Sequence, residues 1–183
     1  YTTTDKKLAT LYIAEARALR GMFYFELVRR FGNVVLMTST QMSNQNPATY
    51  VQSAPEKVYE YIEDDLLYAC DILPYATDDQ YRESNDYRFS KGAALGLLTK
   101  VYATWAGYPV KYESKWEAAA KTARILVESG KHGLLKDYEQ LWKNTCNGTW
   151  DPTESLIEIS FYSPTVSGNS DPVGRIGKWN GVK

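Results

Sequence analysis

The sequence lacks the features that mark several classes of protein. Its 183 residues include one His and two Cys, too few for a multi-histidine metal site or a disulfide framework. No apolar run approaches the ~20 residues that a membrane-spanning helix needs. Lysine and arginine number 21 against 22 aspartate and glutamate, so the basic excess typical of nucleic-acid-binding proteins is missing.

Motifs of common enzymes are also missing. The sequence has no phosphate-binding loop, no GxSxG, no HExxH and no CxxC. Two weaker arrangements are a nucleophile–base pair of Cys146 with His132, and a glycosidase pair of Glu154 and Glu158. Their residue types are common and their spacing carries little weight, so we expect no enzymatic activity.

The acidic pairs at 64–65 and 78–79 lack the loop pattern of a calcium-binding hand. They are more typical of solvated surface, and we therefore expect neither a metal site nor a cofactor. 

Aromatic residues, in contrast, are abundant. Fifteen Tyr, five Trp and five Phe make up 14% of the chain. A tyrosine ring has an apolar face and a polar tip, so it can pack in a core, stack on a sugar or anchor a protein partner. We expect most of these rings to pack between helices.

The first helix is predicted from about Asp5 to Phe31, capped by Thr4 or Asp5 and ended by Gly32. Glu26 precedes Arg29 and Arg30 by three and four residues, which predicts a local ion pair. Apolar residues form two faces with helical spacing. One face is Leu8, Tyr12, Ala16, Leu19, Phe23 and Leu27, and the other is Leu11, Ala14, Ala18, Met22 and Phe25. Two apolar faces predict neighbours on both sides of this helix.

Further amphipathic helices are predicted at 53–73, 90–106 and 116–129. Ser53 with Glu56, and Ser114 with Glu117, have the spacing of capping boxes. Residues 137–142 could add a turn or two, and residues 155–161 are the one good strand candidate. Cys70 lies beside the apolar stripe of its helix, which indicates a small buried side chain.

The predicted fold class is mostly α. The helices at 90–106 and 116–129 form an antiparallel pair similar to tetratricopeptide helix pairs, with long loops and little strand. We assign residues 1–161 to this helical scaffold and residues 162–183 to a loop segment rich in Gly and Pro. The sequence has no initiator Met and no signal peptide, so we interpret it as an internal segment that leads into a missing C-terminal part.

The ordered segments resemble the SusD/RagB family of outer-membrane nutrient-binding lipoproteins. AEARALRGMFYFELVRRFGNVVL at Ala14–Leu36 carries the strongest likeness. The resemblance continues through Val58–Pro74, Arg88–Val110, Lys115–Trp142 and Glu154–Phe161. Small departures, such as Val35 where the family usually has Pro, concern local turns.

This resemblance implies a helical scaffold with tetratricopeptide-like pairs and no enzymatic activity. It further implies a surface-exposed lipoprotein of the outer membrane that binds glycans and delivers them to a SusC-like TonB-dependent transporter. The lipid anchor would lie outside this segment. Two alternatives remain open: a member of the family that captures peptides, and a helical scaffold that binds other proteins.

Ligand-binding residues cannot be transferred by motif, because the family's aromatic platforms lie in variable loops. We therefore predict aromatic residues carried by loops, together with polar neighbours that could pair sugar hydroxyls. The predicted ligand-binding residues are Trp150, Tyr162, Trp179, Asn169, Arg175 and Asn180, with Tyr81 and Asn85 as second choices.

Overall fold

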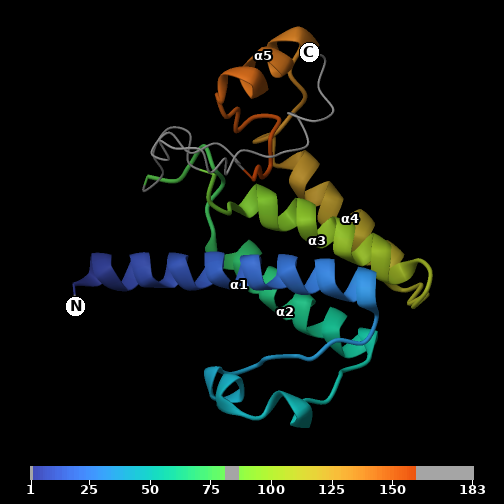
Figure 1. Cartoon of the computed structure of the whole chain (residues 1–183). Helices are drawn as coiled ribbons and strands as arrows, with labels where there is room; N and C mark the ends of the chain where they lie inside the picture. The colour runs from blue at the N-terminus through green and yellow to red at the C-terminus, as the bar shows by residue number, and fades with distance from the viewer. Residues whose placement is uncertain (1, 81–86, 160–183) are drawn as a thin grey trace, which may run out of the picture.

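The computed structural model describes residues 2–80 and 87–159 of the chain. Within them lie five α-helices and two short 3-10 helices (Figure 1). Their bounds are α1 Thr3–Phe31, η1 Thr40–Asn44, η2 Pro47–Thr49, α2 Pro55–Ile72, α3 Lys91–Ala106, α4 Lys115–Glu128 and α5 Tyr138–Asn147. The mostly-α prediction is confirmed.

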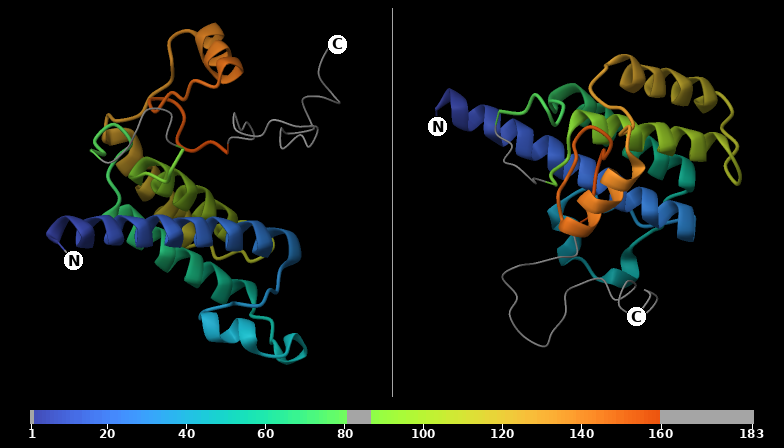
Figure 2. Two further views of the ribbon diagram at one scale, coloured as in Figure 1. Left: turned by 60° about the vertical axis from the view of Figure 1, so that its left-hand side comes forward. Right: turned by 90° about the horizontal axis from the view of Figure 1, so that it is seen from above.

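The first four helices form two stacked pairs. α1 packs on α2, α3 packs on α4, and α2 joins the pairs by packing on α3 (Figures 1 and 2). α5 packs on none of these helices in the described part of the chain and stands above the α3 end of the bundle in Figure 1. No described helix is apolar over a stretch that would cross a membrane.

The core lies where α1, α2 and α3 meet. Its largest fully buried apolar side chains are Phe25, Ile62, Leu66, Leu98, Val58 and Val101. Burying a side chain of this size stabilises the fold by about 1.5–3 kcal/mol.

Local signals place α1 well, but not its first residue. The helix begins at Thr3, and Thr2 is the cap: its hydroxyl accepts from the Asp5 N–H at 3.1 Å, while Asp5 accepts from the Thr2 N–H at 2.8 Å. The prediction of Thr4 or Asp5 as cap was therefore wrong by two to three residues. Gly32 ends the helix with φ of 69°, a conformation that suits glycine.

The predicted ion pair of Glu26 with Arg29 and Arg30 is confirmed.

Described residues cover only one of the two apolar faces of α1. Ala14, Ala18 and Phe25 are buried against the neighbouring helices. On the other face, Phe23 is 58% exposed, and Tyr12, Leu19 and Leu27 are also exposed. Burial on both sides is thus not found within the described residues.

Both predicted capping boxes were wrong. The backbone of Ser53 forms a bridge with Val34, with N···O distances of 2.8 and 3.3 Å, so α2 begins after Ala54 with Pro55 in its first turn. Ser114 directly precedes α4 with helical dihedral angles, φ −60° and ψ −18°, and its side chain makes no capping hydrogen bond. Ser90 does cap α3, where its hydroxyl accepts from the Ala93 N–H at 3.2 Å.

The predicted strand at 155–161 is not a strand over residues 155–159, which form no regular element. A strand requires a neighbouring strand edge, and the described residues offer none beside this segment. Instead, it packs on α3, where a Cβ at Gly96 would lie 2.6 Å from Leu156 Cδ1. One turn earlier, a Cβ at Gly92 would lie 2.0 Å from His132 Nε2. The two glycines let both loop segments lie directly on the helix.

Asp65 is buried in an ion cluster, which corrects the prediction of solvated surface. Arg17 Nε lies 2.8 Å from one carboxylate oxygen, and Arg20 donates from Nε and Nη2, each at 2.7 Å. The two guanidinium groups lie over the rings of Tyr68 and Tyr61, at 4.3 and 4.8 Å from the ring centres. Asp64, the exposed neighbour, fits the surface prediction.

Burial makes Cys70 unreactive, as expected for a small core side chain. Desolvation raises the pKa of its thiol to about 12, whereas Cys146 is exposed on α5. At pH 8 we expect a thiol reagent such as Ellman's reagent to modify Cys146 quickly and Cys70 only after unfolding. Cys146→Ser should remove the fast phase and Cys70→Ser should leave it; fast reaction in Cys146→Ser would contradict this.

Candidate functional site

Most of the predicted ligand-binding residues lie outside the described residues. This applies to Tyr81, Asn85, Tyr162, Asn169, Arg175, Trp179 and Asn180. The boundary predicted between residues 161 and 162 lies outside them as well. Trp150 is the one predicted residue whose surroundings can be described.

Trp150 is packed within the fold. Its side chain is 8% exposed, and its ring centre lies 6.2 Å from that of Tyr87. The Tyr87 hydroxyl donates to the Gly148 carbonyl at 3.3 Å, which holds the loop before Trp150 in place. A ligand role for Trp150 stays a prediction; in this arrangement the ring supports the loop and is not an open platform.

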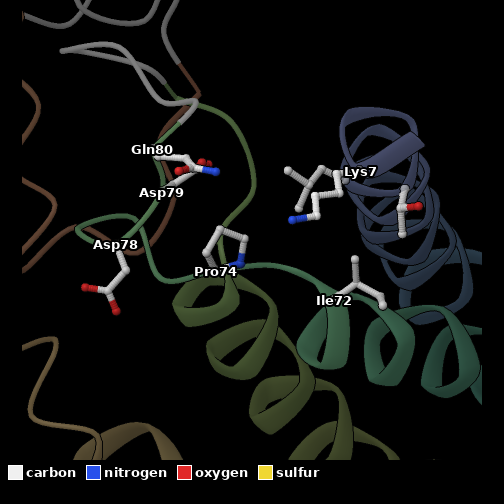
Figure 3. Close-up of a pocket in the computed structure, with 8 residues that line it drawn as sticks. Lys7, Ile72, Pro74, Asp78, Asp79 and Gln80 are labelled. Carbon is white, nitrogen blue, oxygen red and sulfur yellow. The ribbon is translucent and has the colours of Figure 1, made fainter. Parts of the chain in front are cut away.

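A hollow of about 380 Å³ opens between the start of α1, the end of α2 and the loop after it (Figure 3). Its lining combines an apolar floor with polar side chains at the rim. The lining residues are Lys7, Thr10, Leu11, Ile72, Pro74, Asp78, Asp79 and Gln80.

The fold creates this hollow at the point where α2 stops. Pro74 has no N–H to continue a helix, and the chain turns away from α1 after Leu73. Figure 3 shows the Lys7 side chain extending from α1 toward the loop, with Asp79 and Gln80 together on the opposite side. An ammonium, a carboxylate and an amide therefore face a gap floored by Ile72 and Pro74.

This combination suits a small polar ligand with apolar patches. Charged and amide groups can pair hydroxyls, while the aliphatic floor can contact C–H faces. Among the described residues, no group of three or more His, Cys, Asp or Glu side chains could hold a metal ion.

Asp78 points away from the hollow and fixes its loop (Figure 3). Its carboxylate accepts a hydrogen bond from Lys131 Nζ at 2.8 Å, which ties the loop to the segment after α4. This hydrogen bond is the main cause that lowers the pKa of Asp78 below its ordinary value of 3.8.

The ion pair between Asp78 and Lys131 has a measurable pH dependence. A carboxylate whose pKa is lowered by folding stabilises the folded state above pH 3.8, and the contribution is lost as the pH falls through the lower, folded value. In Lys131→Ala, we expect the pKa of Asp78 to rise toward 3.8, measured by NMR titration of its carboxyl carbon. Lys136→Ala removes an exposed lysine from the same segment after α4 and should leave the pKa of Asp78 unchanged. An unchanged Asp78 pKa in Lys131→Ala would contradict the assignment.

Sequence reasoning missed Lys7 and Gln80. Neither belongs to a motif, and 72 positions separate them in the sequence, so only the packing of α1 on α2 brings them to one hollow. Pro74, which directly follows the helix predicted at 53–73, is a local signal that the helix ends here.

Glu154 and His132, members of the two weaker catalytic pairs, both contact other groups among the described residues. Glu154 accepts from the Leu135 backbone N–H at 2.6 Å, which gives its carboxylate a structural role. His132 packs against Gly92 and lies 5.9 Å from Tyr75, ring centre to ring centre, while Cys146 is exposed on α5. 

The described residues form a scaffold of stacked helix pairs with a hollow bounded by a loop. A family model described as "Starch-binding associating with outer membrane" matches residues 2–103. The chain belongs to this SusD-like family.

Solved structures agree with this assignment. A SusD homolog from Bacteroides thetaiotaomicron is 99% identical, with a TM-score of 0.94 over 100% of this chain and 34% of its own. A structure with a xylogluco-oligosaccharide is 32% identical, with a TM-score of 0.66 over 82% of this chain and 29% of its own. A laminarin-binding SusD-like protein is 32% identical, with a TM-score of 0.59 over 78% of this chain and 30% of its own. The chain thus spans about a third of the length of these proteins.

Proposed function

We propose that the chain is part of a non-catalytic protein that binds oligosaccharides or polysaccharides at the cell surface. The observation that carries the proposal is similarity to two solved structures, one with a xylogluco-oligosaccharide and one of a laminarin-binding SusD-like protein. Both match about four fifths of this chain.

The proposal includes delivery of the glycan to a SusC-like TonB-dependent transporter by a lipoprotein of the outer membrane. The association of the matched family with the outer membrane supports this location. 

The hollow at Lys7 and Gln80 is our candidate for one sugar contact. Its size, apolar floor and polar rim fit a ring that has C–H faces and hydroxyl edges. Tyr81, one of the predicted ligand residues, follows Gln80 directly in the sequence.

Retardation in native gels cast with polysaccharides tests the proposal, followed by calorimetry with oligosaccharides. We expect binding to a glycan such as xyloglucan or laminarin. A hydrogen bond from a charged donor contributes about 1.5–3 kcal/mol, so Lys7→Ala with Gln80→Ala should weaken binding about tenfold or more. Lys121→Ala, on an exposed face of α4, is the matched control.

The outcomes separate the function from its site. The affinity could stay unchanged in the variant with Lys7 and Gln80 replaced, but fall when Trp150, Tyr162 and Trp179 are all replaced with Ala. That result would assign the binding site to these three aromatic residues and not to the hollow. No binding to any polysaccharide, with capture of a peptide or a protein, would contradict the glycan proposal.

A further inference from the structure

A second hollow, of about 290 Å³, lies at the opposite end of the helices from the hollow at Lys7 and Gln80. It is bounded by the end of α1, the start of α2 and the loop from α3 to α4, which lie together at one end of the bundle in Figures 1 and 2. Lys7 lines the first hollow and Arg29 the second, and at 1.5 Å per residue they are about 33 Å apart along α1. A short oligosaccharide cannot contact both hollows, whereas a polysaccharide can.

The lining of this second hollow combines rings and aliphatic groups with polar side chains. Tyr59, Pro109 and Val110 supply apolar surface, and Arg30 and Tyr108 supply a guanidinium and a phenol. Tyr59 is only 3% exposed, whereas Tyr108 is 84% exposed, so the ring of Tyr108 is open to a ligand. A sugar ring has C–H faces that pack on an aromatic ring and hydroxyl edges that need polar partners, and this lining offers both.

Hydrogen-bonding groups at this hollow remain available to a ligand. Nη2 of Arg30 donates to the Glu26 carboxylate at 2.8 Å. A guanidinium has five N–H groups, so Arg30 can be held in place by Glu26 and still donate to a sugar hydroxyl. The Tyr108 hydroxyl, which can donate and accept, has no hydrogen-bond partner within residues 2–80 and 87–159.

The loop that carries Tyr108 is fixed on both sides of this residue. The Lys111 N–H donates to the Gly107 carbonyl at 2.7 Å, and the Tyr112 N–H donates to the Trp105 carbonyl at 3.1 Å. The ring of Tyr112 also stacks on buried Trp105, with ring centres 5.3 Å apart. Nζ of Lys111 lies 5.9 Å from the Tyr108 ring centre on one face, which leaves the other face for stacking. An exposed ring on a fixed backbone loses little conformational entropy when a ligand binds.

We infer that the second hollow is a further glycan contact, in which Tyr108 stacks on the C–H face of a sugar ring and Arg30 donates to its hydroxyls. This contact rests on the proposed function, glycan binding, and it acts on polysaccharides. Two contacts on one ligand chain raise the apparent affinity by roughly 10²–10⁴ over either contact alone. The protein therefore binds a polysaccharide more tightly than a short oligosaccharide of the same sugar.

Comparing polymer with oligosaccharide binding in the full-length SusD homolog tests this contact. The probes are xyloglucan and laminarin in native gels, and their short oligosaccharides in calorimetry. In Tyr108→Ala and in Arg30→Gln, we expect the affinity for the polysaccharide to fall about tenfold and that for the oligosaccharide to change by less than about twofold. Tyr108→Phe keeps the ring and should retain most of the polymer binding. Tyr138→Ala is the matched control, because Tyr138 is 80% exposed and lies on α5.

The outcomes separate this contact from the proposed function. Polysaccharide binding by the unchanged protein, with equal affinity in Tyr108→Ala and Tyr138→Ala, would overturn the second contact and leave glycan binding intact. Equal losses for polymer and oligosaccharide in Tyr108→Ala would also overturn it, because Tyr108 would then belong to the main site. No binding of any polysaccharide by the unchanged protein would contradict both proposals. Thermal unfolding of each variant shows that the fold is kept, and we expect unchanged midpoints for Tyr108→Ala because its side chain is exposed.

Discussion

Replacing Asp65 with alanine should lower the free energy of unfolding by about 3 kcal/mol, measured by guanidinium denaturation. Removing one partner of a buried ion pair costs about 3–5 kcal/mol because the remaining charge loses its compensation. Asp65 is 1% exposed in its side chain, whereas those of Arg17 and Arg20 are 30% and 39% exposed. The two guanidinium groups can therefore recover some hydration, which puts the expected loss at the lower end of that range.

Asp64→Ala is the matched control for this prediction. Asp64 is the exposed neighbour on the same helix, and only its backbone carbonyl contacts Arg17, at 3.3 Å. We expect its effect to stay within about 0.5 kcal/mol, as for most surface substitutions. Equal losses in the two variants would show that the cluster does not hold α1 on α2.

Replacing Trp105 with alanine should cost about 3–5 kcal/mol, the range found for large aromatic residues in cores. Its side chain is stacked between two others, with ring centres 5.3 Å from both Tyr59 and Tyr112. Lys115 Nζ lies 4.3 Å above the indole. Loss of the indole would leave a cavity where α2, α3 and the start of α4 meet.

A polar network beside the indole adds to this effect. Lys115 Nζ also lies 2.7 and 2.8 Å from the two carboxylate oxygens of Glu63, and the Tyr102 hydroxyl donates to Glu63 at 2.6 Å. Burial, followed by the hydrogen bond to Glu63, raises the pKa of Tyr102. Without Trp105, this network loses the packing that shields it from water.

The control is Trp116→Ala, which removes the same side chain from an exposed position on α4. We expect a loss below about 1 kcal/mol in the same denaturation experiment. Similar losses for both tryptophans would contradict the assignment of Trp105 to the core.

Sequence alone determined the helices and the family. The helix predicted at 90–106 is α3, which Ser90 caps and which ends before Gly107. The pairing of Glu26 with Arg29 and Arg30 was predictable because these residues are three and four positions apart. These features depend on contacts three or four residues apart, which the sequence displays directly.

Only the tertiary structure decided which polar residues are buried and which groups meet. Asp64 and Asp65 are adjacent in the sequence, yet one is exposed and the other holds two arginines from α1, because helical rotation turns only Asp65 toward that helix. Ser53 has the spacing of a cap, but its backbone pairs with Val34 instead. Lys7 and Gln80 line one hollow because α1 packs on α2 and Pro74 ends the helix between them. Each of these outcomes depends on contacts between residues far apart in the chain, whose positions are set when the helices pack and not by local spacing.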